Sequence, residues 1–204
     1  MMNSFRYICI FWILALSTQL IGCASAPPTR FYVLSPATLS EKEQRPPEAP
    51  CVSIGIGPVQ IPEYLGRSGI VTRVTPHEVV VSTLNRWAEP LKDNLSRALA
   101  ENLSSLLCIK SVLMLPASGV SSVDYRIRIE VIRMDGNLGD TAVLDVFWMV
   151  LAGKKVLLSK RSSHQQTTGG EGYEEFVSAQ SRNLASLSRE IAEVILAPSQ
   201  QRQQ

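Results

Sequence analysis

The sequence predicts an α+β fold, a two-layer α/β domain in which a mixed β-sheet packs two long helices on one face. Apolar and polar residues alternate strictly over 123–131, which is typical of a half-exposed strand. Two other stretches, 85–107 and 173–197, repeat apolar residues every three or four positions, as amphipathic helices do. The order of elements is therefore strands, helix, strands, helix, which favours helices gathered on one side of a sheet.

The other strands are predicted from short apolar runs bounded by turn residues. They are 30–34, 52–56, 70–74, 79–81, 109–115, 142–151 and 155–165. Pro58 indicates an edge or a bend. Ala152-Gly153-Lys154 is predicted to join the last two strands as a hairpin, and the stretch from Met134 to Asn137 is predicted to be the turn after strand 123–131.

Each helix is expected to face the core with one apolar stripe. The stripes consist of Leu91, Leu95, Leu99, Leu103 and Leu106 in the first helix, and of Phe176, Gln180, Leu184, Leu187, Ile191 and Val194/Ile195 in the second. Pro90 suits the first turn of a helix, where its missing N–H is not needed. Trp87 is interpreted as a core aromatic at the entrance of the first helix, with a docking role as the alternative.

Residues 1–22 are predicted to be a cleaved secretory signal. One basic residue, Arg6, precedes an apolar run, and the polar residues 17–19 end that run before it reaches the ~20 residues that a membrane span needs. An uncleaved N-terminal anchor is the alternative. Leu20-Ile21-Gly22-Cys23 resembles the bacterial lipobox, which implies attachment of diacylglycerol and fatty acids such as palmitate at Cys23 and cleavage just before it.

The mature chain is expected to begin at Cys23. Three acyl chains, which the lipoproteins that it resembles carry, would bind a bilayer far more firmly than the marginal affinity of one chain. By resemblance to enterobacterial sorting signals, Ala24 implies the outer membrane. We expect residues 23–30 to form a lipidated tether, 31–197 the folded domain and 198–204 a disordered tail.

Two cysteines remain inside the expected domain, Cys51 and Cys108. Each lies beside an apolar run, so neighbouring strand starts would bring them together, and an oxidising periplasm permits a disulfide. Two buried, unpaired thiols are the alternative, because free cysteine is often buried.

Charge and motifs argue against several function classes. The net charge of +2 falls to +1 when residues 1–22 are removed, and no basic cluster indicates a nucleic-acid partner. His77 and His164 have no metal-ligand spacing around them, so neither a metal nor a cofactor is expected. Gly55-Ile56-Gly57 is followed by Pro58 rather than a helix, which argues against a dinucleotide site. No hydrolase or phosphate-loop motif occurs, so we do not expect an enzyme.

Five stretches, in this order, resemble a known family. They are the lipobox Cys23, then FYVL (31–34), IGIGPVQIPEYLGRSGIVTR (54–73), NRWAEPLKDNLSRALAENLSSLL (85–107) and VSAQSRNLASLSREIAEVI (177–195). Together they look like the ABC-type transport auxiliary lipoproteins of the PqiC/YmbA kind. The chain departs from the family at Gly66, where an acidic residue is common, and at Ser68, where Pro is common.

The resemblance implies a non-catalytic lipoprotein on the periplasmic face of the outer membrane, in a system that carries lipids between membranes and maintains the envelope. Its implied partners are a mammalian-cell-entry (MCE) domain protein and inner-membrane transporter components, and a homo-oligomer is compatible with this role. The alternatives are an envelope assembly lipoprotein that modulates another complex and a periplasmic hydrolase.

One segment is a candidate surface for partner docking. It contains Tyr64, Leu65, Arg67 and Ile70, and aromatic and Arg side chains are favoured at interfaces. The alternative is that Tyr64 and Leu65 close the core of the sheet.

Overall fold

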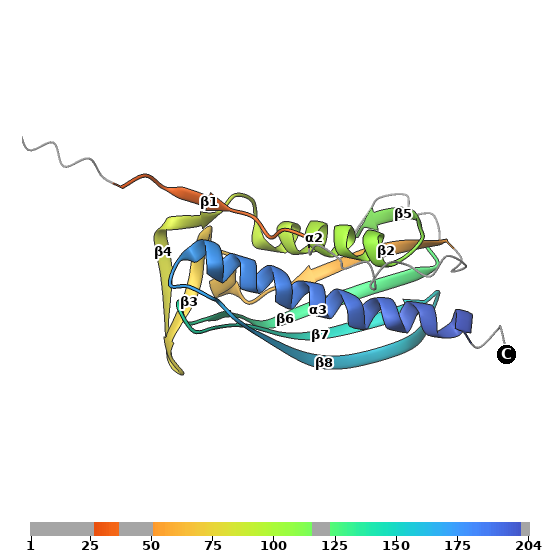
Figure 1. The fold of residues 1–204 in the computed structure, drawn as a ribbon. Coiled ribbons are helices and arrows are strands. Elements are labelled where there is room, and N and C mark those ends of the chain that lie inside the picture. Colours follow the sequence, from red (N-terminus) through yellow and green to blue (C-terminus); the bar gives the residue numbers. More distant parts are fainter. Residues whose placement is uncertain (1–26, 37–50, 116–122, 201–204) are drawn as a thin grey trace, which may run out of the picture.

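A computed structural model describes residues 27–36, 51–115 and 123–200 of this chain (Figure 1). The strands are β1 (Arg30–Tyr32), β2 (Val52–Gln60), β3 (Gly69–Thr75), β4 (Glu78–Trp87), β5 (Ile109–Met114), β6 (Tyr125–Gly136), β7 (Thr141–Ala152) and β8 (Lys155–Thr167). The helices are a 3-10 turn, η3 (Glu63–Leu65), and two long α-helices, α2 (Leu91–Leu106) and α3 (Tyr173–Gln200). The predicted α+β class is confirmed.

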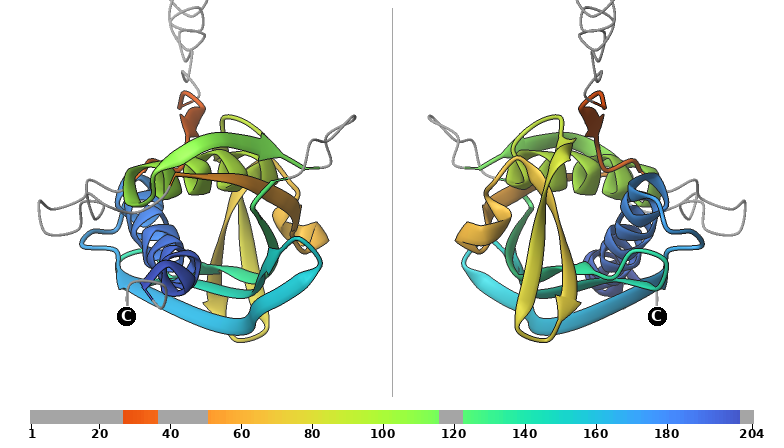
Figure 2. Two further views of the ribbon diagram at one scale, coloured as in Figure 1. Left: turned by 90° about the vertical axis from the view of Figure 1, so that its right-hand side faces the viewer. Right: turned by 90° about the vertical axis from the view of Figure 1, so that its left-hand side faces the viewer.

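The larger sheet has five strands in the order β5-β2-β6-β7-β8. It is mixed, because β2 pairs in parallel with both β5 and β6, whereas β6, β7 and β8 pair antiparallel. The sheet curves around the two helices, which both lie on its concave side (Figure 2). This arrangement is the one that the order of the predicted elements favours.

A second sheet, which the sequence did not predict as separate, has three strands in the order β1-β4-β3. β3 and β4 form an antiparallel hairpin, and β1 pairs in parallel with the last three residues of β4. This small sheet closes one end of the molecule, the end at which α3 begins (Figure 1).

The core lies between the curved sheet and the helices. All five leucines of the predicted stripe in α2 are buried, as are Phe176, Gln180, Leu184, Leu187, Ile191 and Ile195 of α3. From the sheet, Ile127, Val146 and Val150 are fully buried opposite them. The helical periodicity therefore identified the inward-facing residues correctly.

The predicted start of the first helix is wrong. Residues 85–87 belong to β4, where Trp87 donates its backbone N–H to Ser68 O at 2.7 Å, and the helix begins only at Leu91. Pro90, predicted in the first turn, instead precedes the helix with an extended ψ of 128°, and its carbonyl oxygen accepts the first hydrogen bonds of the helix, from the N–H groups of Asp93 (2.9 Å) and Asn94 (3.1 Å). Trp87 is buried, as predicted, but at the end of a strand.

The predicted turn at Met134–Asn137 is also misplaced. β6 continues through Gly136, and the chain turns at residues 137–140 instead. Asp135 is polar yet fully buried inside the strand, because partners from elsewhere in the fold satisfy its carboxylate. At the other end, α3 continues to Gln200, three residues past the predicted end of the domain.

The glycines and proline at 55–58 have a structural explanation. The pairing of β2 with β6 shifts between Ile56 and Val59, so the bend expected from Pro58 is a β-bulge inside the sheet. Gly57 has a φ of +122°, and a Cβ there would lie 2.4 Å from the backbone oxygen of Leu115. Only glycine fits this position, which explains the Gly-x-Gly pattern without a nucleotide.

Candidate functional site

The predicted lipidation residue, Cys23, lies outside the described residues. The structure does describe residues 27–36, which include the end of the predicted tether and the start of the domain. After β1, the backbone N–H of Leu34 donates to Asn94 Oδ1 of α2 at 2.7 Å. The N–H of Ser35 donates to Ser181 Oγ of α3 at 3.2 Å. Leu34 itself is 1% exposed. The first segment of the domain is therefore fastened to both long helices.

The segment predicted for docking connects the two sheets. Pro62 starts the short turn η3, and Gly66 closes it by donating its N–H to Glu63 O. Leu65 and Ile70 are buried at 2% and 0% exposure, so their side chains belong to the core and present no surface. Arg67 is exposed and Tyr64 is partly buried. The structure thus brings the four residues together in one segment, with two of them facing solvent.

Tyr64 leads to a buried ion-pair centre around Asp135. The guanidinium of Arg73, on β3, donates from Nη2 to Asp135 Oδ2 at 2.7 Å and from Nε to Oδ1 at 3.0 Å. Arg133, two residues before Asp135 on β6, donates to the same carboxylate, and the Tyr64 hydroxyl lies 3.5 Å from Oδ2. The centre joins the small sheet, the large sheet and the candidate docking segment at one carboxylate.

The charges in this centre hold one another ionised. Burial alone would raise the pKa of Asp135, but the hydrogen bonds and charges of Arg73 and Arg133 outweigh it and the pKa is lowered. Burial, followed by the charge of Asp135, raises the pKa of Tyr64, which therefore stays protonated. Because the Asp135 carboxylate is paired with both arginines, this centre holds β3 against β6, and the carboxylate is not free to act as a base.

Buried amides of α3 tie the same region to the helix layer. Gln180 Nε2 donates to the backbone oxygens of Asp135 (3.2 Å) and Val143 (3.1 Å). Asn183 Nδ2 donates to Ala142 O at 3.0 Å. The sequence analysis placed Gln180 on the inward face without assigning it a partner, and it gave no role to Asp135, Arg73 or Asn94. The one sequence signal for these buried polar contacts was Gln180, a polar residue on the otherwise apolar stripe of its helix.

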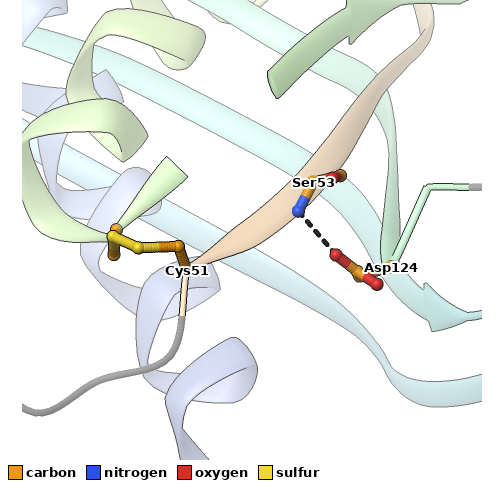
Figure 3. The surroundings of a disulfide bond; sticks show 4 residues. Cys51, Ser53 and Asp124 are labelled. Atoms are coloured by element: carbon orange, nitrogen blue, oxygen red, sulfur yellow. Dashed lines mark hydrogen bonds between the residues drawn. A yellow bond between two sulfur atoms is a disulfide. The ribbon is translucent and has the colours of Figure 1, made fainter. Parts of the chain in front are cut away.

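Cys51 and Cys108 are joined by a disulfide, with their Cα atoms 4.3 Å apart (Figure 3). Each cysteine directly precedes one of two parallel neighbours, β2 and β5, whose first residues Val52 and Ile109 are in register. Figure 3 also shows the N–H of Ser53 donating to Asp124, at 2.7 Å. The disulfide therefore joins the start of β2, in the large sheet, to the segment that follows α2.

The two histidines take no part in a site with metal-ligand geometry. His77 is exposed in the β3–β4 turn. His164 lies 3.7 Å from Glu190 Oε1, and burial lowers its pKa. Glu190 also accepts hydrogen bonds from Ser162 and Lys160, which links α3 to β8. Within residues 27–36, 51–115 and 123–200, no group of three or more His, Cys, Asp or Glu side chains is placed to hold a metal ion.

The family model described as "ABC-type transport auxiliary lipoprotein component" matches residues 32–192. The chain belongs to this family. The matched region runs from the end of β1 into α3 and contains the candidate docking segment, the disulfide and the Asp135 centre.

Relatives of this auxiliary lipoprotein are found among curated proteins and solved structures. The chain is 24% identical over 186 residues to the intermembrane transport lipoprotein PqiC of Escherichia coli K12, and equally to that of Shigella flexneri, with 88% of this chain and 96% of each relative covered. A crystal structure of a protein from Xanthomonas campestris has a TM-score of 0.68 at 17% identity, over 86% of this chain and 99% of that one. A second, uncharacterized protein has a TM-score of 0.67 at 22% identity, over 83% and 99%. Both structures share the fold.

Among the described residues, neither α2 nor α3 combines the length and the apolar character needed to cross a bilayer.

Proposed function

We propose that this protein is a lipid-anchored auxiliary component of an MCE/ABC-type system for lipid transport between the inner and outer membranes. Cys23 would carry the lipid, and the protein would be held at the periplasmic face of the outer membrane. The observation that carries the proposal is the family match over 32–192, together with relatives named as intermembrane transport lipoproteins that this chain matches over 96% of their length.

The proposed role is non-enzymatic. The described charged groups with the strongest mutual contacts, Asp135 with Arg73 and Arg133, are saturated by one another. Glu190 likewise accepts from Lys160 and Ser162. These groups favour a scaffold that presents surfaces, because general acid–base catalysis requires a group that is free to exchange a proton with substrate.

The docking proposal is narrowed to the solvent side of the Tyr64–Arg67 turn. Arg67 is the exposed charge there, and Tyr64 is partly accessible above the Asp135 centre. Leu65 and Ile70 would hold this turn rigid from inside the core. An exposed arginine beside an aromatic, on a turn that buried residues hold in place, is a favourable contact point for an MCE-domain protein, since less backbone entropy is lost on binding.

Anchoring is tested by replacing Cys23 with alanine and following processing and membrane fractionation in cells. We expect the Cys23→Ala protein to stay unprocessed by lipoprotein maturation and to leave the outer-membrane fraction. Cys9→Ala, inside the predicted signal, is the matched control and should behave like the natural protein. Unchanged processing and fractionation of Cys23→Ala would contradict the anchoring proposal.

Partner docking is tested by photo-crosslinking in cells, with the crosslinking residue at Arg67 or, as a control, at Glu193 on the exposed side of α3. We expect an MCE-domain protein to be recovered from position 67 and not from position 193. Recovery of other envelope proteins from both positions, without any MCE-domain protein, would favour an assembly role in another complex and refute the transport proposal.

A further inference from the structure

The small sheet exposes an unusual share of apolar side chains. Nine large hydrophobic side chains are exposed among the described residues, and six of them lie on β1, just after it, or on the β3–β4 hairpin. They are Phe31 (64%), Val33 (43%), Val74 (58%), Val79 (36%), Val80 (43%) and Leu84 (36%). Such clustering marks an interaction site, whereas single exposed apolar residues need no explanation.

The end of the hairpin is uncovered on both faces. Val79 and Val80 are consecutive residues of β4 and therefore point to opposite sides of the strand, yet both are exposed. In the described part of the chain, β1 pairs with β4 only at residues 85–87, so the stretch 78–84 has a strand neighbour, β3, on one side only. An apolar strand edge of this kind is normally covered or protected by charge.

The edge strand β8 shows how this fold protects an exposed edge. It carries Lys155, Lys160 and Arg161 along its length. The stretch 79–84 of β4 carries no charged residue at all. Cations instead border the small sheet at its other end, where Arg86 lies in register with Phe31, and Arg30 is also exposed. An aromatic flanked by arginines suits the boundary between acyl chains and anionic headgroups.

The short distance along the chain from Cys23 to the small sheet favours the membrane as the partner that covers these exposed apolar side chains. Phe31 is eight residues from Cys23, so an extended chain spans at most about 28 Å between them. α3 alone, with 28 residues, is about 42 Å long, and it runs away from the small sheet (Figure 1). A lipid on Cys23 therefore keeps Phe31 and the small sheet within about 28 Å of the membrane, whereas the opposite end of the molecule is free to lie farther out.

We propose that the β1 edge and the β3–β4 hairpin lie on the bilayer that holds the lipid anchor, with Phe31, Val74, Val80 and Leu84 in the headgroup–acyl boundary. The proposal rests on the anchoring at Cys23 proposed above. The contact adds a second attachment to the acyl chains and fixes the orientation of the domain. The end formed by the β7–β8 turn then points away from the membrane.

The test uses the acylated protein that remains after signal cleavage, in vesicles of phosphatidylethanolamine and phosphatidylglycerol, with a polarity-sensitive thiol-reactive dye at position 80. Val80→Cys supplies the dye site, and Val156→Cys is a matched control, because Val156 is also a strand valine, is 47% exposed, and lies beside the β7–β8 turn. Leu84→Cys gives a second site on the small sheet. Cleavage before Cys23 removes Cys9, acylation blocks Cys23, and the disulfide blocks Cys51 and Cys108, so each variant offers one reactive thiol.

We expect vesicles to shift the dye emission at positions 80 and 84 to the blue and to leave position 156 unchanged. Flotation of the vesicles separately reports whether the protein is anchored. Failure to float would overturn both proposals. Flotation with unshifted emission at positions 80 and 84 would overturn only the membrane-contact surface. A blue shift that develops with protein concentration in detergent, without vesicles, would assign the surface to a second copy and also overturn it.

Discussion

Replacing Asp135 with asparagine removes the one anion that two guanidinium groups share. The Asp135 side chain is fully buried, whereas the side chains of Arg73 and Arg133 are 21% and 34% exposed. Breaking a buried ion pair from one side costs about 3–5 kcal/mol. Both cations can partly rehydrate here, so we expect Asp135→Asn to lower the free energy of unfolding by about 2–4 kcal/mol at pH 7. For a domain of this size that corresponds to a fall of about 5–15 °C in Tm.

The pH dependence gives an independent check. The pKa of Asp135 is lower in the folded protein than in the unfolded chain, so its contribution is present in full above the unfolded pKa of about 3.9 and is lost as pH falls through the folded value. Urea unfolding followed by circular dichroism at pH 7 and at pH 3 should therefore show the variant and the natural protein converging in acid. Asp140→Asn, at an exposed aspartate in the next turn, is the control and should change stability little. A loss below about 1 kcal/mol at pH 7, or an equal loss at both pH values, would refute the reasoning.

The remaining predictions concern the disulfide, His164 and the docking turn. The double substitution Cys51→Ser and Cys108→Ser should lower the free energy of unfolding by about 4 kcal/mol, because the disulfide closes a loop with a sequence separation of 57 residues. Reduction of the natural protein should lower it by the same amount. A different loss of stability in the two cases would contradict the prediction that the disulfide alone is responsible. The pKa of His164 is lowered by burial, so stability should decline as pH falls below about 6.5, and His164→Gln should flatten that decline in urea midpoints measured between pH 7.5 and 5.5. Leu65→Ala should lower the free energy of unfolding by about 2–5 kcal/mol, because Leu65 is buried in the core. Arg67→Ala should change this free energy by no more than about 0.5 kcal/mol and should reduce crosslinking to the partner. Equal losses of stability in the two variants would contradict the assignment of Leu65 to the core and Arg67 to the surface.

Periodicity predicted most of the helices and strands because burial on one face imposes it directly. The leucines of α2 and the stripe from Phe176 to Ile191 in α3 face inward for this reason. The alternation over 123–131 likewise gives the inward residues of β6, including Ile127 and Ile129. Such patterns are local, so a single sequence reveals them without knowledge of the fold.

The Asp135 centre could not be predicted in this way. Arg73 and Asp135 are 62 residues apart in the sequence, and nothing local indicates that they meet. The sequence Met134-Asp135-Gly136-Asn137 has the composition of a turn, and that local preference was overridden by partners supplied from β3. The split into two sheets depends on the same kind of distant pairing, between β1 and the end of β4.

The position of the disulfide has a mechanical consequence for a chain anchored at Cys23. A pull on the anchor would load β1 first, which holds β4 through three residue pairs, and then the hydrogen bonds from Leu34 to Asn94 and from Ser35 to Ser181. Once these yield, the load would reach Cys51, where the covalent bond to Cys108 passes part of it to the segment after α2, so that β2 does not bear it alone. The disulfide would then divide a pull on the anchor between two strands of the large sheet, β2 and β5, which already pair with each other.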